Sequence, residues 1–125
     1  MRDNSQMILS LNADISNLSN QIAGNQEKIN LLKKSYDELS NEQQEFNSYK
    51  KLINQPKLDT SVWGGKHAER FNGERSEIEQ QHSLITDLVD QQLDNILSKI
   101  NSLESTNASL SNSISSKRIE ISNLK

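Results

Sequence analysis

The sequence predicts an all-α fold in which two long helices form an antiparallel, coiled-coil-like helical hairpin. Apolar residues make up only 32% of the 125 residues, and the mean hydropathy is −0.79. A compact globular domain needs an apolar fraction of roughly half. The apolar residues recur at steps of three and four along two long stretches. A short segment with the only proline and two adjacent glycines separates these stretches. This pattern predicts two helices that share a narrow buried seam.

The first helix is predicted over about residues 4–54. Steps of three and four from Ile8 meet apolar residues at eleven of fourteen positions, which are Ile8, Leu11, Ile15, Leu18, Ile22, Asn25, Ile29, Leu32, Tyr36, Leu39, Gln43, Phe46, Lys50 and Ile53. This is the heptad pattern of a coiled coil. A disordered chain has no reason to maintain such spacing, so the pattern excludes disorder for the folded state.

The second helix is predicted over about residues 62–124, with Asp59, Thr60 and Ser61 as candidate N-caps. Its seam positions are Ala68, Phe71, Arg75, Ile78, His82, Ile85, Val89, Leu93, Ile96, Ile100, Leu103, Asn107, Leu110, Ile114, Lys117, Ile121 and Leu124. Two consecutive steps of four, from Ile85 to Leu93, interrupt the heptads. Such a stutter locally relaxes the left-handed supercoil.

The bend is predicted over about residues 55–65, since Pro56 disfavours helix at the residue before it. Two helices of similar length with a short linker favour antiparallel packing. We therefore predict one helical-hairpin domain over residues 1–125. In that hairpin Ile53 would face Ala68, and Ile8 would lie near the level of Asn112.

The predicted seam is thin and partly polar. Its polar members are Asn25, Gln43, Lys50, Arg75, His82, Asn107 and Lys117. The outer faces are rich in Ser and Asn, which are weaker helix formers than Ala, Leu or Glu. These features predict a hairpin that is marginal alone and firmer in a bundle with a helical protein partner.

No catalytic or cofactor site is predicted. The chain has no Cys, and His67 and His82 lie fifteen residues apart. The four glycines form no phosphate-binding loop, and a thin hairpin offers no cleft that excludes water. We expect no cofactor, no metal and no enzymatic activity. The net charge of −3 disfavours nucleic acid and anionic membrane surfaces. No apolar run reaches the ~20 residues of a membrane span, and we expect neither membrane insertion nor a cleaved signal peptide.

The only tryptophan, Trp63, stands at the predicted bend. It either packs against the end of the hairpin core or forms an exposed recognition tip, because Trp suits both roles. Trp63, Gly65, Ala68 and Phe71 together match the pattern W-x-G-x-x-A-x-x-F. This match resembles the WXG superfamily, the small helical hairpins of type VII secretion systems. The charged stretch at residues 75–81 and the Ser/Asn-rich second helix resemble the YwqH-like branch, which is associated with LXG-type toxins.

The resemblance implies a non-catalytic partner or targeting factor that binds the helical N-terminal region of an LXG-type toxin for export. Partner binding would involve Trp63, Gly65, Ala68 and Phe71. A second small hairpin protein is a further candidate partner, and a homodimer is a candidate state of the chain alone. The resemblance implies a cytoplasmic protein, or one exported by type VII secretion without a cleaved signal. Many exported relatives carry Tyr-x-x-x-Asp/Glu after the second helix, whereas neither Tyr here follows the bend. The alternative is a structural coiled-coil module for oligomerisation or spacing.

Overall fold

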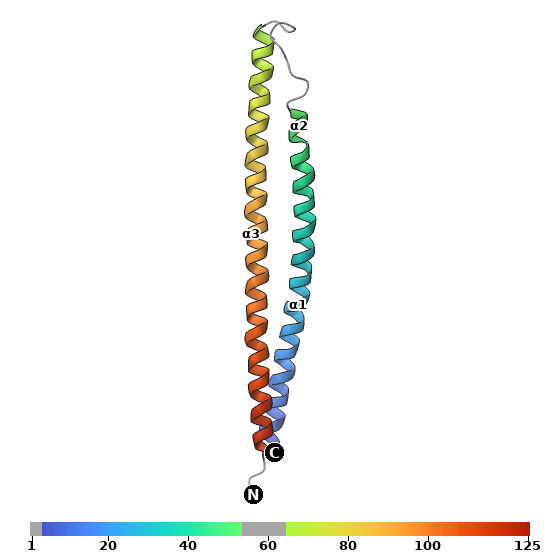
Figure 1. Ribbon diagram of the computed structural model, residues 1–125. Helices are drawn as coiled ribbons and strands as arrows, with labels where there is room; N and C mark the ends of the chain where they lie inside the picture. The colour runs from blue at the N-terminus through green and yellow to red at the C-terminus, as the bar shows by residue number, and fades with distance from the viewer. Residues whose placement is uncertain (1–3, 54–64) are drawn as a thin grey trace. The chain divides into compact units, whose positions relative to one another are not determined.

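The computed structural model describes residues 4–53 and 65–125, and every element in them is helical. α1 spans Ser5–Ser48, α2 spans Lys50–Ile53, and α3 spans Gly65–Leu124. The N-terminal helices and α3 run in opposite directions and pack against each other (Figure 1). The prediction of an all-α hairpin is therefore confirmed.

The described helices differ from the predicted ones in one place. The first predicted helix, over about 4–54, is interrupted at Tyr49 and continues as the short helix α2. The second predicted helix, over about 62–124, is described from Gly65 to Leu124, and its predicted start lies outside the described residues. The remainder of the predicted bend, residues 55–64, lies outside the described residues.

The packing divides the chain into two compact units. Unit 1 comprises Met1–Lys34 and Ile96–Lys125, and unit 2 comprises Ser35–Asn95. Each unit contains antiparallel stretches of the two long helices. The prediction of one domain over residues 1–125 stays a prediction.

Unit 1 contains the apolar core of the described residues. Ile29, only 1% exposed, packs with Ile100 and Leu103, and the half-buried Leu32 and Ile96 pack against this cluster. All five are predicted seam residues. Burying a branched aliphatic side chain contributes about 1.5–3 kcal/mol, so this cluster is the main apolar stabilisation of the unit.

Polar seam residues in unit 1 form polar contacts across the two helices. Asn25 Nδ2 donates to Asn107 Oδ1 over 3.0 Å, and Lys117 lies 3.6 Å from the carboxylate of Asp14. At the helix ends, Asn4 Nδ2 donates to the backbone oxygen of Leu124 over 3.1 Å. That oxygen lacks a partner within α3, as the last carbonyls of any helix do. Each bond requires one alignment of the helices, so the polar residues specify the register.

The register that these bonds define corrects the predicted one. Asn4 lies beside Leu124, so antiparallel packing brings Ile8, four residues later, to about the level of Glu120. The sequence had suggested Asn112. Similarly, Ile53 lines a hollow with Arg75 rather than facing Ala68. The prediction assumed that the end of the first helix and the start of the second lie side by side. In unit 2 the first turns of α3 instead extend past the end of α2, so Ile53 lies beside residues further along α3.

Unit 2 is held together largely by polar and aromatic contacts. The rings of His82 and Phe46 stack with centroids 4.2 Å apart, and His82 is buried. Gln43 Nε2 donates to the carboxylate of Asp90 over 2.7 Å and to the backbone oxygen of Thr86 over 3.3 Å. This unit has fewer buried aliphatic side chains than unit 1, so its stability depends more on these specific contacts.

The interruption at Tyr49 coincides with the contact made by His82. The backbone oxygen of Phe46 accepts from the Tyr49 N–H over 3.2 Å, a tighter turn than the α-helical pattern. The same oxygen lies 3.0 Å from His82 Nε2. A carbonyl oxygen can only accept, so Nε2 carries the hydrogen in this contact. His82 thus fixes both the end of α1 and its own tautomer.

Candidate functional site

The four predicted recognition residues fall in different environments. Trp63 lies outside the described residues. Gly65 is exposed at the start of α3, and a Cβ added there would meet no atom within 4 Å. Ala68 is fully buried. Phe71 is half-buried, and the guanidinium of Arg75 lies 4.8 Å from its ring centroid. Among the three described, Phe71 is the one with a side chain on an accessible surface.

The position of α3 in unit 2 moves two predicted seam residues to the surface. The buried and half-buried positions after Phe71 are 75, 79, 82, 86, 89 and 93. These steps average more than the 3.5 residues of a heptad, so the line of contact drifts away from the predicted heptads. As a result Ile78 and Ile85 are 54% and 45% exposed. Glu79 and Thr86 face the partner helix in their place.

Ile78 lines the first of two apolar hollows on this side of unit 2. The hollow is about 230 Å³ and is lined by Leu52, Ile53, Phe71, Glu74, Arg75 and Ile78. It therefore includes Phe71 of the W-x-G-x-x-A-x-x-F motif. Arg75 remains over the Phe71 ring, where the cation–π attraction holds both side chains in place.

Ile85 lines the second hollow, which is about 250 Å³. Its lining is Leu39, Glu42, Gln43, Phe46, Ile85 and Val89. Ile78 and Ile85 are seven residues apart, which is two helical turns, so they lie on the same side of α3. We call this side of unit 2, with the two hollows, the apolar flank.

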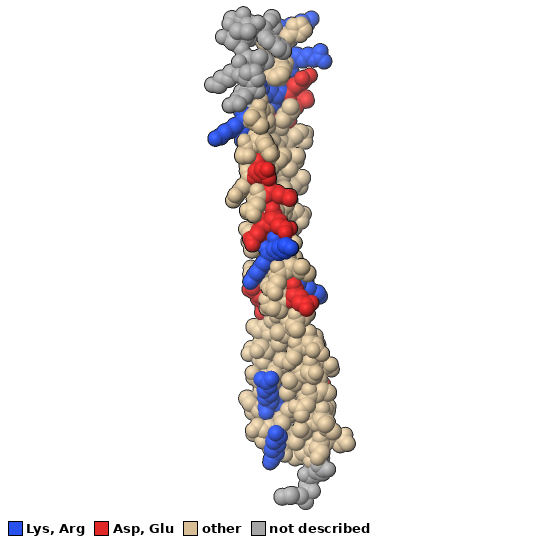
Figure 2. Space-filling view, turned by 90° about the vertical axis from the view of Figure 1, so that its right-hand side faces the viewer, with Lys and Arg blue, Asp and Glu red and all other residues tan. Residues whose placement is uncertain are grey.

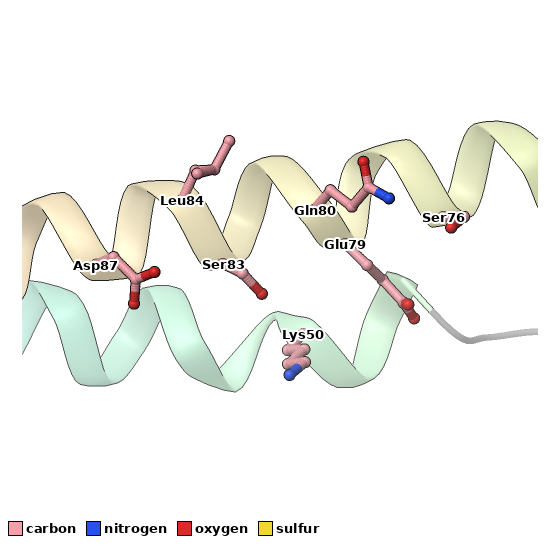
Figure 3. A pocket seen from close by; sticks show the side chains of 7 residues that line it. All are labelled: Lys50, Ser76, Glu79, Gln80, Ser83, Leu84 and Asp87. Carbon is pink, nitrogen blue, oxygen red and sulfur yellow. The ribbon is translucent and has the colours of Figure 1, made fainter.

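The other side of unit 2 is polar. A hollow of about 480 Å³ is lined there by Lys50, Ser76, Glu79, Gln80, Ser83, Leu84 and Asp87. Glu79, Ser83 and Asp87 project from α3 toward the helix that carries Lys50, while Leu84 points away (Figure 3). Among the described residues no group of His, Cys, Asp or Glu could hold a metal ion. We call this side the polar flank, and its chemistry is that of a solvated, charged helix surface.

The two units differ in charge. The sequence of unit 2 has twelve acidic and six basic residues, which gives −6. The sequence of unit 1 has five acidic and eight basic residues, which gives +3. On the face in Figure 2, acidic side chains gather on the part that belongs to unit 2. A partner that contacts unit 2 therefore meets apolar hollows in an acidic setting.

A family model matches residues 7–125, nearly the whole chain, and its description is YwqH-like. The chain belongs to the YwqH-like family. This family stands among the helical proteins of the WXG superfamily that are associated with type VII secretion. The resemblance inferred from Trp63, Gly65, Ala68 and Phe71 is therefore confirmed at the level of the family. No catalytic family is indicated.

Other comparisons add no further relative of this YwqH-like chain, because no curated protein and no solved structure matches it. Within residues 4–53 and 65–125, no helix has the length and hydropathy needed to cross a membrane. The many large apolar side chains at the surface, including Ile78, Leu84 and Leu88, suggest protein partners.

The apolar flank was not predicted as a site from the sequence. Leu39, Phe46, Ile85 and Val89 were all assigned to the seam, where they would be buried inside the hairpin. The signal that could have located the flank is the stutter from Ile85 to Leu93. Two steps of four turn the apolar stripe relative to the partner helix, and part of it must then face outward.

Proposed function

We propose that this YwqH-like protein is a non-catalytic targeting factor that binds the helical N-terminal region of an LXG-type toxin for type VII secretion. The observation that carries the proposal is the apolar flank, where Ile78 and Ile85 are about half exposed and Ile78 shares a hollow with Phe71 of the motif. A surface patch of this kind marks a protein-interaction site. The family match supplies the secretion context.

A helix is the partner shape that suits this flank. The two hollows are centred on Ile78 and Ile85, which are separated by about 10 Å along α3. Helices that dock in grooves present anchors at i, i+3 or i+4, and i+7. Two apolar anchors one heptad apart would enter the two hollows, and each buried anchor contributes about 1.5–3 kcal/mol before the costs of association.

The remaining parts of the proposal follow from the same role. The protein acts in the cytoplasm, where it meets the toxin before export, and leaves with the toxin without a cleaved signal if it is exported. A second small hairpin protein can share the complex. Trp63 then contributes to recognition together with Gly65, Ala68 and Phe71.

Two neighbouring residues of α3 provide a matched test. Ile85 lines the apolar flank and is 45% exposed, whereas Leu84 lines the polar flank and is 55% exposed. The chain is co-expressed with the N-terminal region of an LXG-type protein from the same genome, and the complex is purified by a tag on that region. We expect Ile85→Ser to weaken binding by about tenfold or more, since one lost anchor is worth at least 1.4 kcal/mol. Leu84→Ser should bind as the unchanged protein does.

Several results would contradict the proposal. It fails if no complex forms with the unchanged chain, or if Leu84→Ser and Ile85→Ser weaken the complex equally. Circular dichroism of each variant checks that helicity is retained. A Trp63→Ala variant separates the recognition role from the alternative of a structural spacer, because a spacer would not need that side chain for binding.

A further inference from the structure

The hollow beside Ile85 is lined by one charged side chain, Glu42, among four apolar residues and Gln43. Glu42 is exposed, and it forms no ion pair within the described residues. The amide nitrogen of Gln43 is already used, because it donates to the carboxylate of Asp90 and to the backbone oxygen of Thr86. The rim of this apolar hollow therefore carries a carboxylate that has no cation beside it.

The hollow beside Ile78 differs, because its charged groups have partners within unit 2. Its charged lining residues are Glu74 and Arg75. Arg70 Nε lies 3.6 Å from the carboxylate of Glu74, and the guanidinium of Arg75 lies over the ring of Phe71. The two hollows of the apolar flank are thus alike in having apolar linings, but only the one beside Ile85 presents a carboxylate without a cation.

Glu42 lies on the side of Ile85 that faces away from Ile78. Its neighbour Gln43 bonds to Thr86 and Asp90, which follow Ile85 along α3. Ile78 is seven residues before Ile85, so it lies toward the opposite end of unit 2. A helix that covers both hollows therefore meets the carboxylate near one of its ends, beyond the anchor in the hollow beside Ile85.

A carboxylate in this place selects among the helices that could dock. Docking removes water from Glu42, and a charged group that loses water without gaining a partner is unfavourable. A Lys or Arg on the docking helix supplies a charge-assisted hydrogen bond, whereas an acidic residue adds repulsion. The net charge of −6 on unit 2 attracts a basic partner over longer distances as well. Attraction of one class and repulsion of another is how an interface becomes specific.

We propose that Glu42 is a specificity-determining residue of the apolar flank, and that the partner is an amphipathic helix with a Lys or Arg just outside its pair of anchors. This inference rests on the proposed function and adds the chemistry of the partner helix. The basic residue lies three or four positions beyond the anchor that enters the hollow beside Ile85, since side chains at that spacing are neighbours on a helix. A helix with a basic residue at that end alone docks in one direction, because the reversed helix leaves Glu42 without a cation.

The test measures the affinity of the full chain for the N-terminal region of an LXG-type protein from the same genome. Glu42→Gln should weaken binding about tenfold at low ionic strength, as loss of one charge-assisted hydrogen bond predicts. The loss should shrink at high ionic strength, where salt screens the pair. Asp87→Asn makes the same change of net charge on the polar flank, and it should bind as the unchanged chain does.

A charge exchange identifies the basic residue on the partner. Each Lys and Arg of the partner region is changed to Glu in turn. One of these variants should bind the unchanged chain poorly and should bind the Glu42→Lys chain well, because the pair is then restored with its charges exchanged. Restored binding also shows that the Glu42→Lys chain is folded.

The outcomes separate this inference from the proposed function. The inference is overturned if Glu42→Gln binds as the unchanged chain does, if Asp87→Asn weakens binding equally, or if no partner variant is rescued. Tighter binding by Glu42→Lys would show an acidic helix in the hollow and would overturn it as well. In each of these cases the proposed function stands as long as Ile85→Ser still weakens the complex. If the unchanged chain forms no complex, both are overturned.

Discussion

The hydrogen bond between Asn25 and Asn107 is expected to help fix the register of the two helices in unit 1, and its contribution can be measured. Asn25 Nδ2 donates to Asn107 Oδ1 over 3.0 Å, and Asn107 Nδ2 lies 3.4 Å from the backbone oxygen of Ile22. Both asparagines are half-buried in unit 1. We expect the two side chains to be energetically coupled.

The size of the coupling follows from the geometry. A hydrogen bond of this kind contributes a net ~0.5–1.5 kcal/mol. Asn25→Ala removes it but gains helix propensity, which offsets about 0.5 kcal/mol of the loss. The single change should therefore lower the free energy of unfolding by under about 1 kcal/mol. A double-mutant cycle cancels the propensity terms, and its coupling energy should be about 1 kcal/mol.

The assay is urea unfolding followed by circular dichroism at the helical band, for the unchanged chain, Asn25→Ala, Asn107→Ala and the double variant. A coupling energy indistinguishable from zero would refute the account of the register. The pair Lys33 and Glu104 serves as the control cycle. Their charged atoms lie 3.5 Å apart, yet both side chains are about half exposed. Water and salt screen such a pair, so its coupling should stay below about 0.5 kcal/mol.

Three further changes test the packing of the described residues, each by urea unfolding. Ile29→Ala should lower the free energy of unfolding by about 2–5 kcal/mol, because Ile29 is the most buried member of the core cluster; a loss under 1 kcal/mol would contradict that assignment. Gly24→Ala should raise the free energy of unfolding by up to about 1 kcal/mol, since an added Cβ meets nothing within 4 Å. A lower free energy of unfolding would contradict this and would mean that the added methyl group meets a neighbouring atom. Gly65→Ala should be neutral or slightly stabilising for the same reason, and helix loss would contradict this.

The all-α hairpin could be predicted from the sequence because heptad spacing of apolar residues indicates which side of each helix is buried. In unit 1 the predicted seam and the observed core coincide, as Ile29, Ile100 and Leu103 show. Two of the polar seam residues, Asn25 and Asn107, bond to each other across the helices, a pairing that was not predicted from the sequence. The periodicity of apolar residues indicates which face of a helix is buried, and in unit 1 it indicated that face correctly.

The register and the break at Tyr49 could not be read from the same pattern. A heptad seam looks alike when one helix slides by a few turns, and only pairs such as Asn4 with Leu124 select the alignment. The break depends on a contact between His82 and the Phe46 carbonyl, 36 residues apart in sequence. Such a contact leaves no local signal around Tyr49.

The candidate site was predicted only in part. The W-x-G-x-x-A-x-x-F motif led to the correct family, and its Phe71 lines a hollow of the apolar flank. Trp63 lies outside the described residues, so its role in recognition stays a prediction. Ile78 and Ile85 were placed in the seam because strict steps of three and four ignore the gradual drift of a real helix contact. That drift is what exposes them to a partner.

The measurement that most directly tests the central claim is mass by light scattering, on the chain alone and after mixing with the N-terminal region of an LXG-type protein. The account predicts that the mixture forms a hetero-complex of defined mass. It also predicts that Ile85→Ser impairs this complex while Leu84→Ser does not. A homo-oligomer whose mass stays unchanged on mixing would contradict the account and leave a structural coiled coil as the function of the hairpin.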